Sequence, residues 1–453
     1  MNTSSNSQYS AYERVLSLFA KIHAGEGRSV IFLFLNSFFL LFAYYLLKPV
    51  REALVLAEGG AEVRSYAVAA QAILLLLAIP LYGLLFRGKR RLELLRVITL
   101  FFASNLLVFC VLGLLHVNIG IPFFIWLGIL SVTLVAQFWA FAADLYNVEA
   151  GHRLFALIAA GSTLGALVGS EVTKLLLAYF GTYGMMLVAA AVMALTVVLS
   201  DHANRSVPEQ SRGAKDEVMG LDTQASILQG FSIVAKDRYL LLITAFVLLL
   251  NCINSTGEFI LAKVVIERAE ALVLADATQH LTKSAAIGTL YGDFYFWVNL
   301  ITLFLQLFMV RRIWQLIGIR GALLISPFIA FVGYGLVALV PVFAIVRWVK
   351  IAENSSDYSI QSTTRHALFL PVSRVKKYQG KTCIDTFFWR LGDLIQALVV
   401  YVGLNVFDFG IKHFALVNCV LSALWIIVAV QIDLMYRRHT LPRGADTEHD
   451  PIE

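Results

Sequence analysis

Long apolar runs are the feature that most limits how this chain can fold. A helix needs about 20 mainly apolar residues to cross the ~30 Å hydrocarbon core of a bilayer, and such runs recur about a dozen times. They predict transmembrane helices near Ser29–Leu47, Tyr66–Phe86, Val97–Leu115, Ile121–Ala143, Leu154–Phe180, Tyr183–Leu199, Leu240–Leu261, Ala286–Val310, Gly321–Leu339, Val342–His366, Thr382–Asn405 and Ile411–Met435. Of the 453 residues, 59% are hydrophobic and only 15% are charged, so lipid must solvate much of the surface. The expected fold class is an all-α membrane protein with about 12 transmembrane helices.

A polar stretch over residues 200–238 divides these runs into two equal sets. Its core, over 206–215, combines Pro, Ser, Gly and charges, as flexible linkers do. The expected organisation is an N-terminal segment over 1–28, a six-helix bundle over 29–199, the linker over 200–238, a second six-helix bundle over 239–436 and a tail over 437–453. Two such bundles joined by a central linker are the layout of major-facilitator-type transporters. The segment Gly83–Arg91 also resembles the inner-loop motif of those transporters, although it lacks the acidic residue.

Positive charge gathers in alternate loops, at Arg87–Arg91, Arg311–Arg312, Arg374–Lys377 and Arg437–Arg438. This positive-inside pattern predicts that both termini, and the linker, are cytoplasmic. It also accounts for the net charge of +6, so we expect the lipid bilayer as a partner and no nucleic acid. The run Val342–His366 is polar in its second half and could instead be a surface helix, although the charge pattern favours a crossing.

Ionisable residues interrupt four of the apolar runs. Each such group at the bilayer centre costs ~2.5–3.5 kcal/mol on insertion scales, so several on one helix face indicate a wet cavity. Lys48, Arg51 and Glu52, at the end of the first run, form either an anion site at a cavity mouth or a set that reaches the outer headgroups. Asn254 and Glu258, on the seventh run, line either a cavity or a hydrogen-bonded helix seam.

The tenth run carries the longest polar stripe. Polar residues recur there at steps of three or four, over about five helical turns, at Arg347, Lys350, Asn354, Asp357, Gln361 and Arg365. The alternative for this run is an amphipathic surface helix. The eleventh run carries Asp385, Arg390 and Asp393, of which the last two could form a purely structural pair. Asp144, which ends the fourth run, is expected to cap an inner gate with Arg153.

Small residues mark one packing face. Gly161, Gly165 and Gly169 recur at spacing four on the fifth run. Because such ridges let two helix backbones approach closely, we expect this face to pack against another helix.

Motifs for catalysis are missing from the sequence. Gly380-Lys-Thr looks like the end of a phosphate-binding loop, but Val375 stands where that motif needs its first Gly. Neither His-Glu-x-x-His nor Gly-x-Ser-x-Gly occurs. We therefore expect neither an enzyme nor a bound cofactor, and transport driven by exchange or by an ion gradient.

Several stretches resemble the ATP/ADP translocases of plastids and intracellular bacteria, the non-mitochondrial nucleotide transporters. The stretches are Lys48–Leu56 with Gly60–Val63, Phe138–Asp144, Tyr291–Trp297, Asp357–Ile360 with Arg365–Pro371, and Gly380–Asp385 with Arg390–Gly392. The last run is the most specific, and the likeness spans the whole helical body. This resemblance implies exchange of nucleotides, usually ATP for ADP.

The resemblance also implies roles for particular residues. Arg51 matches a cation of the family, and Glu52 and Glu258 match acids. Asp357 stands where the family has a Lys, while Ser362 replaces an Asp and His366 replaces a Glu.

These features predict a transporter of a bacterial inner membrane that works by alternating access. The expected solute is an anionic or phosphorylated small molecule, such as a nucleotide. An ion is a further candidate partner. The expected substrate-binding residues are Lys48, Arg51, Asn254, Glu258, Arg347, Lys350, Asp357, Arg365, Arg390 and Asp393. The expected gating or counter-ion residues are Glu52, Asp144, Arg153 and Asp385. A proton-coupled carrier of another polar or amphiphilic solute and a non-transporting membrane receptor or scaffold stay open as alternatives.

Overall fold

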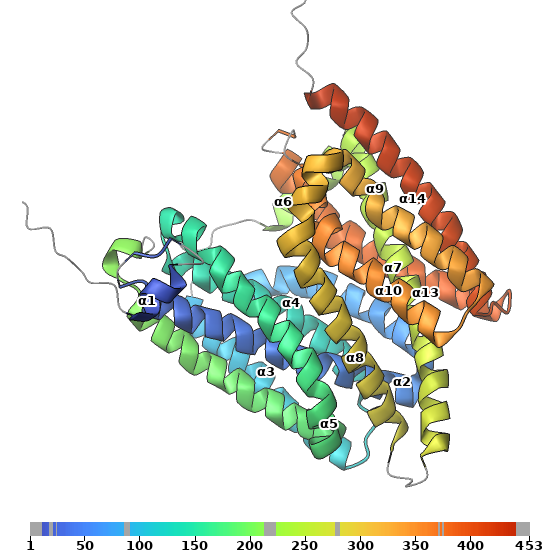
Figure 1. Ribbon diagram of the computed structural model, residues 1–453, viewed down its shortest axis with the longest axis horizontal. Helices are drawn as coiled ribbons and strands as arrows, with labels where there is room; N and C mark the ends of the chain where they lie inside the picture. The colour runs from blue at the N-terminus through green and yellow to red at the C-terminus, as the bar shows by residue number, and fades with distance from the viewer. Residues whose placement is uncertain are drawn as a thin grey trace, which may run out of the picture. The chain divides into compact units, whose positions relative to one another are not determined.

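The computed structural model describes residues 11–17, 21–23, 25–85, 91–212, 223–276, 281–369, 372–373 and 376–440. Within these ranges the chain is almost entirely helical (Figure 1). An isolated β-bridge joins Tyr146 and Arg212. The predictions made for the first ten residues, for Arg87, Lys89, Arg90 and Arg374, for the linker over 213–222 and for the tail over 441–453 lie outside the described residues.

The helices follow the predicted apolar runs. In chain order they are α1 (Ala11–Leu16), α2 (Gly27–Leu85), α3 (Arg91–Leu114), α4 (Gly120–Leu145), α5 (Val148–Ser206), η1 (Glu209–Ser211), α6 (Thr223–Lys236), α7 (Arg238–Ala275), α8 (Lys283–Phe304), η2 (Leu305–Met309), α9 (Val310–Leu339), α10 (Phe343–Ser356), η3 (Asp357–Gln361), α11 (Ser362–Ala367), η4 (Lys376–Gly380), α12 (Lys381–Cys383), η5 (Ile384–Phe388), α13 (Trp389–Asn405) and α14 (Ile411–Thr440). The short element η1 is a 3₁₀ turn, and η2 to η5 are π-helical turns.

Eight helical stretches of the described chain are long and apolar enough to cross a membrane. Three of them, of 51, 58 and 57 residues, would be roughly 75 Å or longer if straight, far beyond the ~30 Å of a bilayer core. Each contains one glycine with a positive φ, namely Gly60 (76°), Gly181 (63°) and Gly318 (70°). Those kinks fall between the apolar runs that the sequence separates, so each long stretch is two helices.

The segment Val342–His366 is a broken helix with buried polar residues in its middle. It consists of α10, the π-helical turn η3 and α11, and it is not among the eight stretches above. Glu353, Asn354, Ser355 and Ser356 are all buried, so the interpretation as an amphipathic surface helix is wrong. The π-helical turn also shifts the register after Ser356, because it adds residues to the turn. The predicted stripe is therefore not one continuous α-helical face.

The chain forms two compact units. Unit 1 contains residues Met1–Leu221 and Leu261–Leu303, and unit 2 contains Asp222–Ile260 and Phe304–Glu453. Helix α7 therefore contributes its first part to unit 2 and its last part to unit 1. The division into six plus six helices at residues 200–238 stays a prediction.

Helices α2 and α5 pack closely in unit 1. A Cβ atom added at Gly161, Gly165 or Gly169 would lie closer than 3.0 Å to backbone oxygens of Phe34, Phe38 and Phe42, respectively. The predicted packing face is therefore confirmed, and its partner is the first part of α2. This contact holds the backbone of α2 in place, and that backbone carries the polar side chains at the end of the first apolar run.

Candidate functional site

The polar residues at the end of the first apolar run are buried inside unit 1. Glu52 is 0% exposed and Lys48 is 8% exposed. Arg51 lies beside Glu52, with Nη2 of Arg51 2.5 Å from Oε1 of Glu52. The alternative in which these side chains reach the lipid headgroups is therefore wrong.

A fourth residue, Arg64, completes this group. Its Nε donates to Oε2 of Glu52 over 2.6 Å, and its side chain is 6% exposed. In a straight helix, 12 residues would separate the two Cα atoms by ~18 Å. The kink at Gly60 reverses the chain and brings Arg64 back to Glu52. Lys48, Arg51, Glu52 and Arg64 are called the α2 cation cluster below.

Sequence reasoning missed Arg64 because that residue lies outside the helical register of Lys48, Arg51 and Glu52. The available signal was a single Arg just before an apolar run, on the side expected to face outward. Its link with Glu52 depends on the kink, which spacing along one helix does not reveal.

Aromatic rings surround the cations of this cluster. Nζ of Lys48 lies 4.0 Å from the centroid of the Tyr295 ring and 5.1 Å from that of Tyr45. The guanidinium carbon of Arg51 lies 4.3 Å from the centroid of Phe124. Cation–π contacts of this kind favour a charged group that has left water. The cluster thus holds three cations and one carboxylate in a buried, partly aromatic setting.

A second charged group lies in unit 2, around Lys350. Nζ of Lys350 contacts Oε2 of Glu353 at 2.9 Å, Oε1 of Glu258 at 3.7 Å and Oδ1 of Asn254 at 2.7 Å. Tyr334 donates its hydroxyl hydrogen to Glu353, and Asn354 donates to Oε1 of Glu258 over 3.1 Å. These six residues are called the Lys350 cluster below: Lys350, Glu353, Glu258, Asn254, Asn354 and Tyr334.

Glu353 was not predicted, although it lies one turn after Lys350. The predicted stripe follows steps of three or four residues from Arg347, and these steps pass from Lys350 to Asn354 without including Glu353. The spacing of three residues between a Lys and a Glu was the available signal.

The polar groups of α7 and α13 meet elsewhere in unit 2. Asp393 accepts hydrogen bonds from Nδ2 of Asn251 over 2.9 Å and from Oγ of Ser255 over 3.1 Å. Nη1 of Arg390 lies 3.5 Å from Oδ2 of Asp393, so the predicted pair forms. These contacts fit the structural alternative, in which the pair joins α13 to α7.

The remaining predicted residues of unit 2 make other contacts as well. The guanidinium of Arg365 stacks on Trp389, with 4.8 Å to the ring centroid, and that of Arg347 lies 5.3 Å from the centroid of Trp348. Nζ of Lys381 lies 3.7 Å from Oδ2 of Asp385. Asp357 begins the π-helical turn η3, one turn after Glu353.

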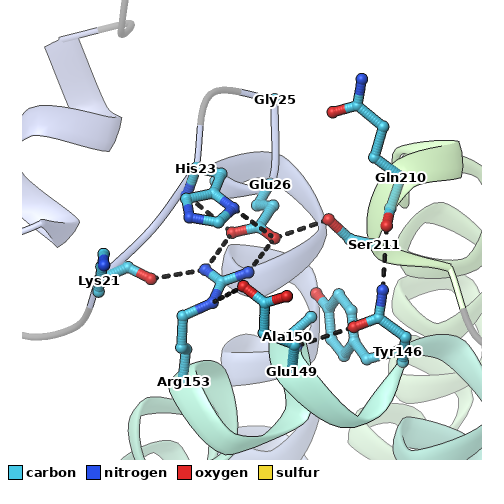
Figure 2. Close-up of polar contacts among 12 residues, drawn as sticks. Lys21, His23, Gly25, Glu26, Tyr146, Glu149, Ala150, Arg153, Gln210 and Ser211 are labelled. Carbon is cyan, nitrogen blue, oxygen red and sulfur yellow. Dashed lines mark hydrogen bonds and ion pairs between the residues drawn. The ribbon is translucent and has the colours of Figure 1, made fainter.

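Asp144 and Arg153, which were predicted to form a gate, pair with other residues in this structure. Asp144, which is half exposed, accepts from Nε of Arg91 over 3.0 Å. Arg153 instead forms a two-pronged pair with Glu26, with Nη1 and Nη2 at 2.9 and 2.8 Å from the two carboxylate oxygens (Figure 2). The physical reason is burial, because Glu26 is 0% exposed and needs a cation more than Asp144 does.

Glu26 lies just before the first apolar stretch and joins three segments of unit 1. It accepts from Oγ of Ser211 over 2.7 Å and from the backbone N–H of His23 over 2.8 Å, in addition to Arg153 (Figure 2). Burial alone would raise the pKa of Glu26, but the hydrogen bonds from Arg153, Ser211 and His23 hold that pKa below its ordinary value. The residue before α2, the start of α5 and the segment after α5 are thereby fixed to one another.

Comparisons with known proteins agree with these features. No model of a protein family matches the sequence. The chain is 22% identical over 352 residues to the ADP,ATP carrier protein 1 of Chlamydia pneumoniae, which covers 68% of this chain and 65% of the relative. It is 22% identical over 314 residues to the ADP,ATP carrier protein 1 of Chlamydia muridarum, over 60% of this chain and 57% of the relative. The chain therefore spans less than two thirds of the length of these curated relatives.

Solved structures with a similar fold are transporters. A peptide transporter in complex with sulfate has a TM-score of 0.62 at 11% identity and covers 91% of this chain and 95% of its own. A POT family transporter in complex with 5-aminolevulinic acid has a TM-score of 0.60 at 14% identity, over 91% and 97%. A nucleoside transporter has a TM-score of 0.59 at 14% identity, over 89% and 99%.

The helical architecture and these neighbours show that the chain shares the fold of these major-facilitator-like transporters, with apolar helices long enough to cross a membrane. Within that class, the chain resembles the non-mitochondrial ATP/ADP translocases, and the resemblance seen in the sequence is confirmed by the Chlamydia relatives. The similar proteins are carriers and transporters and not enzymes, as expected.

Proposed function

We propose that this protein carries an anionic, phosphorylated solute across the membrane by alternating access, and that the solute is of the nucleotide class. The observation that carries this proposal is the α2 cation cluster. The guanidinium groups of Arg51 and Arg64 pair with the Glu52 carboxylate, and the Lys48 ammonium lies over the Tyr295 ring. The cluster thus contains three cations and one carboxylate, and an anion can share this positive charge. The names of the Chlamydia relatives support a nucleotide as the anion.

Arg51 is the residue that we expect to contact the solute. Its Nε is buried and has no hydrogen-bond partner among the described residues. A buried donor without a partner costs about 1–3 kcal/mol, and a phosphate oxygen would accept from it. The planar guanidinium suits a phosphate because two of its N–H groups can donate in parallel. The ring of Phe124 also contacts this guanidinium, with 4.3 Å from its carbon to the ring centroid.

The proposed topology has twelve crossings with both termini in the cytoplasm. The eight candidate stretches contain three that kink at Gly60, Gly181 and Gly318, and the buried segment Val342–His366 supplies the remaining crossing. The positive loops support the cytoplasmic termini, and a bacterial inner membrane is the proposed location. Because the sequence carries no ATPase motif, we propose that exchange of the solute supplies the energy.

A thermal-shift experiment tests the solute class. Purified protein is heated with ATP, ADP, phosphorylated sugars or lipids, because a ligand that binds only the folded state raises the melting temperature. We expect ATP and ADP to raise it in the wild type and in Arg205→Gln, whose side chain is exposed at the end of α5. The shift should disappear in Arg51→Gln. A nucleotide shift that is unchanged in Arg51→Gln would contradict the proposed site, and no shift with any phosphorylated compound would contradict the proposed class.

A further inference from the structure

Gln361 carries a buried amide whose hydrogen-bonding groups are unused. The residue ends the π-helical turn η3 and is 0% exposed, and neither its Nε2 nor its Oε1 makes a hydrogen bond to any described residue. Such an amide is costly, because it has given up its bonds to water and has gained none in return. A buried polar group of this kind calls for a partner that binds in another state of the molecule.

The packing of the surrounding segment does not involve this amide. The hydroxyl oxygens of Ser356 and Ser326 lie 2.7 Å apart, and Nε1 of Trp314 donates to Oγ1 of Thr364 over 3.2 Å. These two bonds join the broken helix to α9 on either side of Gln361 in the sequence. The backbone at Gln361 is therefore held in place by its neighbours, while the donor and the acceptor of its own side chain stay unused.

Arg365 shows the same property one turn later. Its Nε and Nη1 are buried and make no hydrogen bond within the described part of the chain. Asp357 interacts with Arg365 electrostatically, and the guanidinium carbon of Arg365 lies 4.8 Å from the centroid of the Trp389 ring. Residues spaced by four are neighbours on a helix surface, so the unused groups of Gln361 and Arg365 lie together. Gln361, Arg365 and Trp389 are called the Gln361 site below.

The chemistry of the Gln361 site fits a flat nitrogen heterocycle better than a phosphate. An amide presents an acceptor and a donor side by side, as does the edge of a nucleobase, and Gln pairs with adenine in this way. Bases also stack on guanidinium planes and on aromatic rings. A phosphate oxygen only accepts, so it would leave Oε1 of Gln361 without a partner.

We propose that the Gln361 site binds the base of a nucleotide, and that Gln361 determines the preference for compounds that carry a base. The role of this site in transport rests on the proposed function, while the binding of a base does not. In alternating access a solute site is covered in one state and open in another, which accounts for the burial of Gln361 in this structure.

Titration calorimetry on the purified full chain tests the proposal with four probes that represent parts of a nucleotide: adenosine, ribose, ADP and pyrophosphate. We expect the wild type to bind adenosine but not ribose, and to bind ADP more tightly than pyrophosphate. Gln361→Met keeps the length of the side chain but removes its donor and its acceptor. This variant should bind adenosine and ADP roughly 5- to 100-fold more weakly, with unchanged binding of pyrophosphate.

Gln315→Met is the matched control, because Gln315 is exposed on α9 of the same unit. It should bind all four probes as the wild type does. Unchanged binding of adenosine and ADP by Gln361→Met would overturn the proposal. The proposal is equally wrong if pyrophosphate binding weakens by the same factor as ADP binding, since the substitution would then act on the phosphates or on the fold.

Thermal unfolding without any probe gives a second test of the same residue. Because the amide of Gln361 is unpaired in the described structure, Gln361→Met should raise the melting temperature by about 1–3 °C. Gln315→Met should leave the melting temperature unchanged. A lower melting temperature for Gln361→Met would show that the amide stabilises the fold, and would overturn the proposal.

The probes also separate this proposal from the proposed function. If the wild type binds pyrophosphate and ADP equally and does not bind adenosine, the base site is wrong and the anion site at Arg51 stands. If adenosine binds through Gln361 but no phosphorylated compound binds, the base site stands and the proposed phosphorylated solute is wrong.

Discussion

Glu26 is a buried carboxylate of unit 1, and its titration can be tested by experiment. Its folded-state pKa lies below the ordinary value of 4.5. A lowered pKa means that the ionised form stabilises the fold, so this contribution is complete above about pH 4.5 and is lost as the pH falls through the folded-state pKa. Acidification should therefore release the segments that Glu26 joins (Figure 2).

We expect Glu26→Gln to lower the melting temperature at neutral pH and to flatten its fall on acidification, because the variant has no carboxylate to protonate. Melting temperatures between about pH 7 and pH 4 give the measurement. Glu149→Gln, whose side chain is 79% exposed, is the control and should keep the acid slope of the wild type. An unchanged acid slope in Glu26→Gln would show that another group causes the loss.

Glu52 and Arg64 give a second test on single residues. Glu52 carries two guanidinium partners, while Arg64→Gln leaves Glu52 paired with Arg51. Removing one partner of a buried pair costs about 3–5 kcal/mol, so Glu52→Gln should be severe and Arg64→Gln clearly milder. Unfolding of both variants and the double variant in detergent measures this order. Equal losses in the two single variants would contradict the shared pairing.

Residue patterns predicted the first group well and the second only in part. Lys48, Arg51 and Glu52 share one helix face, so their grouping follows from spacing alone. Arg64 joins them only through the kink at Gly60. Lys350 contacts the carboxylates of Glu258 and Glu353, and Glu353 was not among the predicted residues. Spacing identifies which side chains share a helix, but tertiary contacts decide which charges are already neutralised.

At the scale of elements, the glycine ridge of α5 explains why α2 and α5 pack so closely. Gly165 and Gly335 provide a matched pair, since a Cβ at Gly165 would clash with the Phe38 backbone while a Cβ at Gly335 meets nothing within 4 Å. Gly165→Ala should lower the melting temperature. Gly335→Ala should leave it unchanged or raise it, because Ala favours a helix by up to about 1 kcal/mol. The opposite order would contradict the packing of α5 on α2.

Element boundaries were partly readable from the sequence. The breaks at Gly60, Gly181 and Gly318 fall between successive apolar runs, because a chain that crosses the bilayer and then crosses back must turn between the two crossings. The π-helical turn η3 was not foreseen. The spacing of apolar residues along the sequence does not reveal an extra residue in one helical turn, so this turn can be identified only from the structure.

At the scale of the whole molecule, the apolar runs and the positive loops predict an inside position for both termini. Reporter fusions test this, with alkaline phosphatase active only outside the inner membrane and a fluorescent protein folding only inside. Fusions at either terminus should give fluorescence and no phosphatase activity. Opposite results at the two termini would require an odd number of crossings and would remove Val342–His366 from the membrane.

The composition and layout of the chain indicated a transporter, and the comparisons agree. The solute is harder to predict from sequence, because Asp357 changes the charge of a helix that the family resemblance makes important. We propose that the α2 cation cluster in unit 1 binds the anion.

Uptake of labelled ATP into proteoliposomes is the most direct test of the central claim. We expect uptake only when the vesicles are preloaded with ADP, at least about tenfold less uptake for Arg51→Gln, and wild-type uptake for Arg205→Gln. Absence of ATP or ADP exchange under every imposed gradient, in protein that binds lipid and folds normally, would contradict nucleotide transport by this chain.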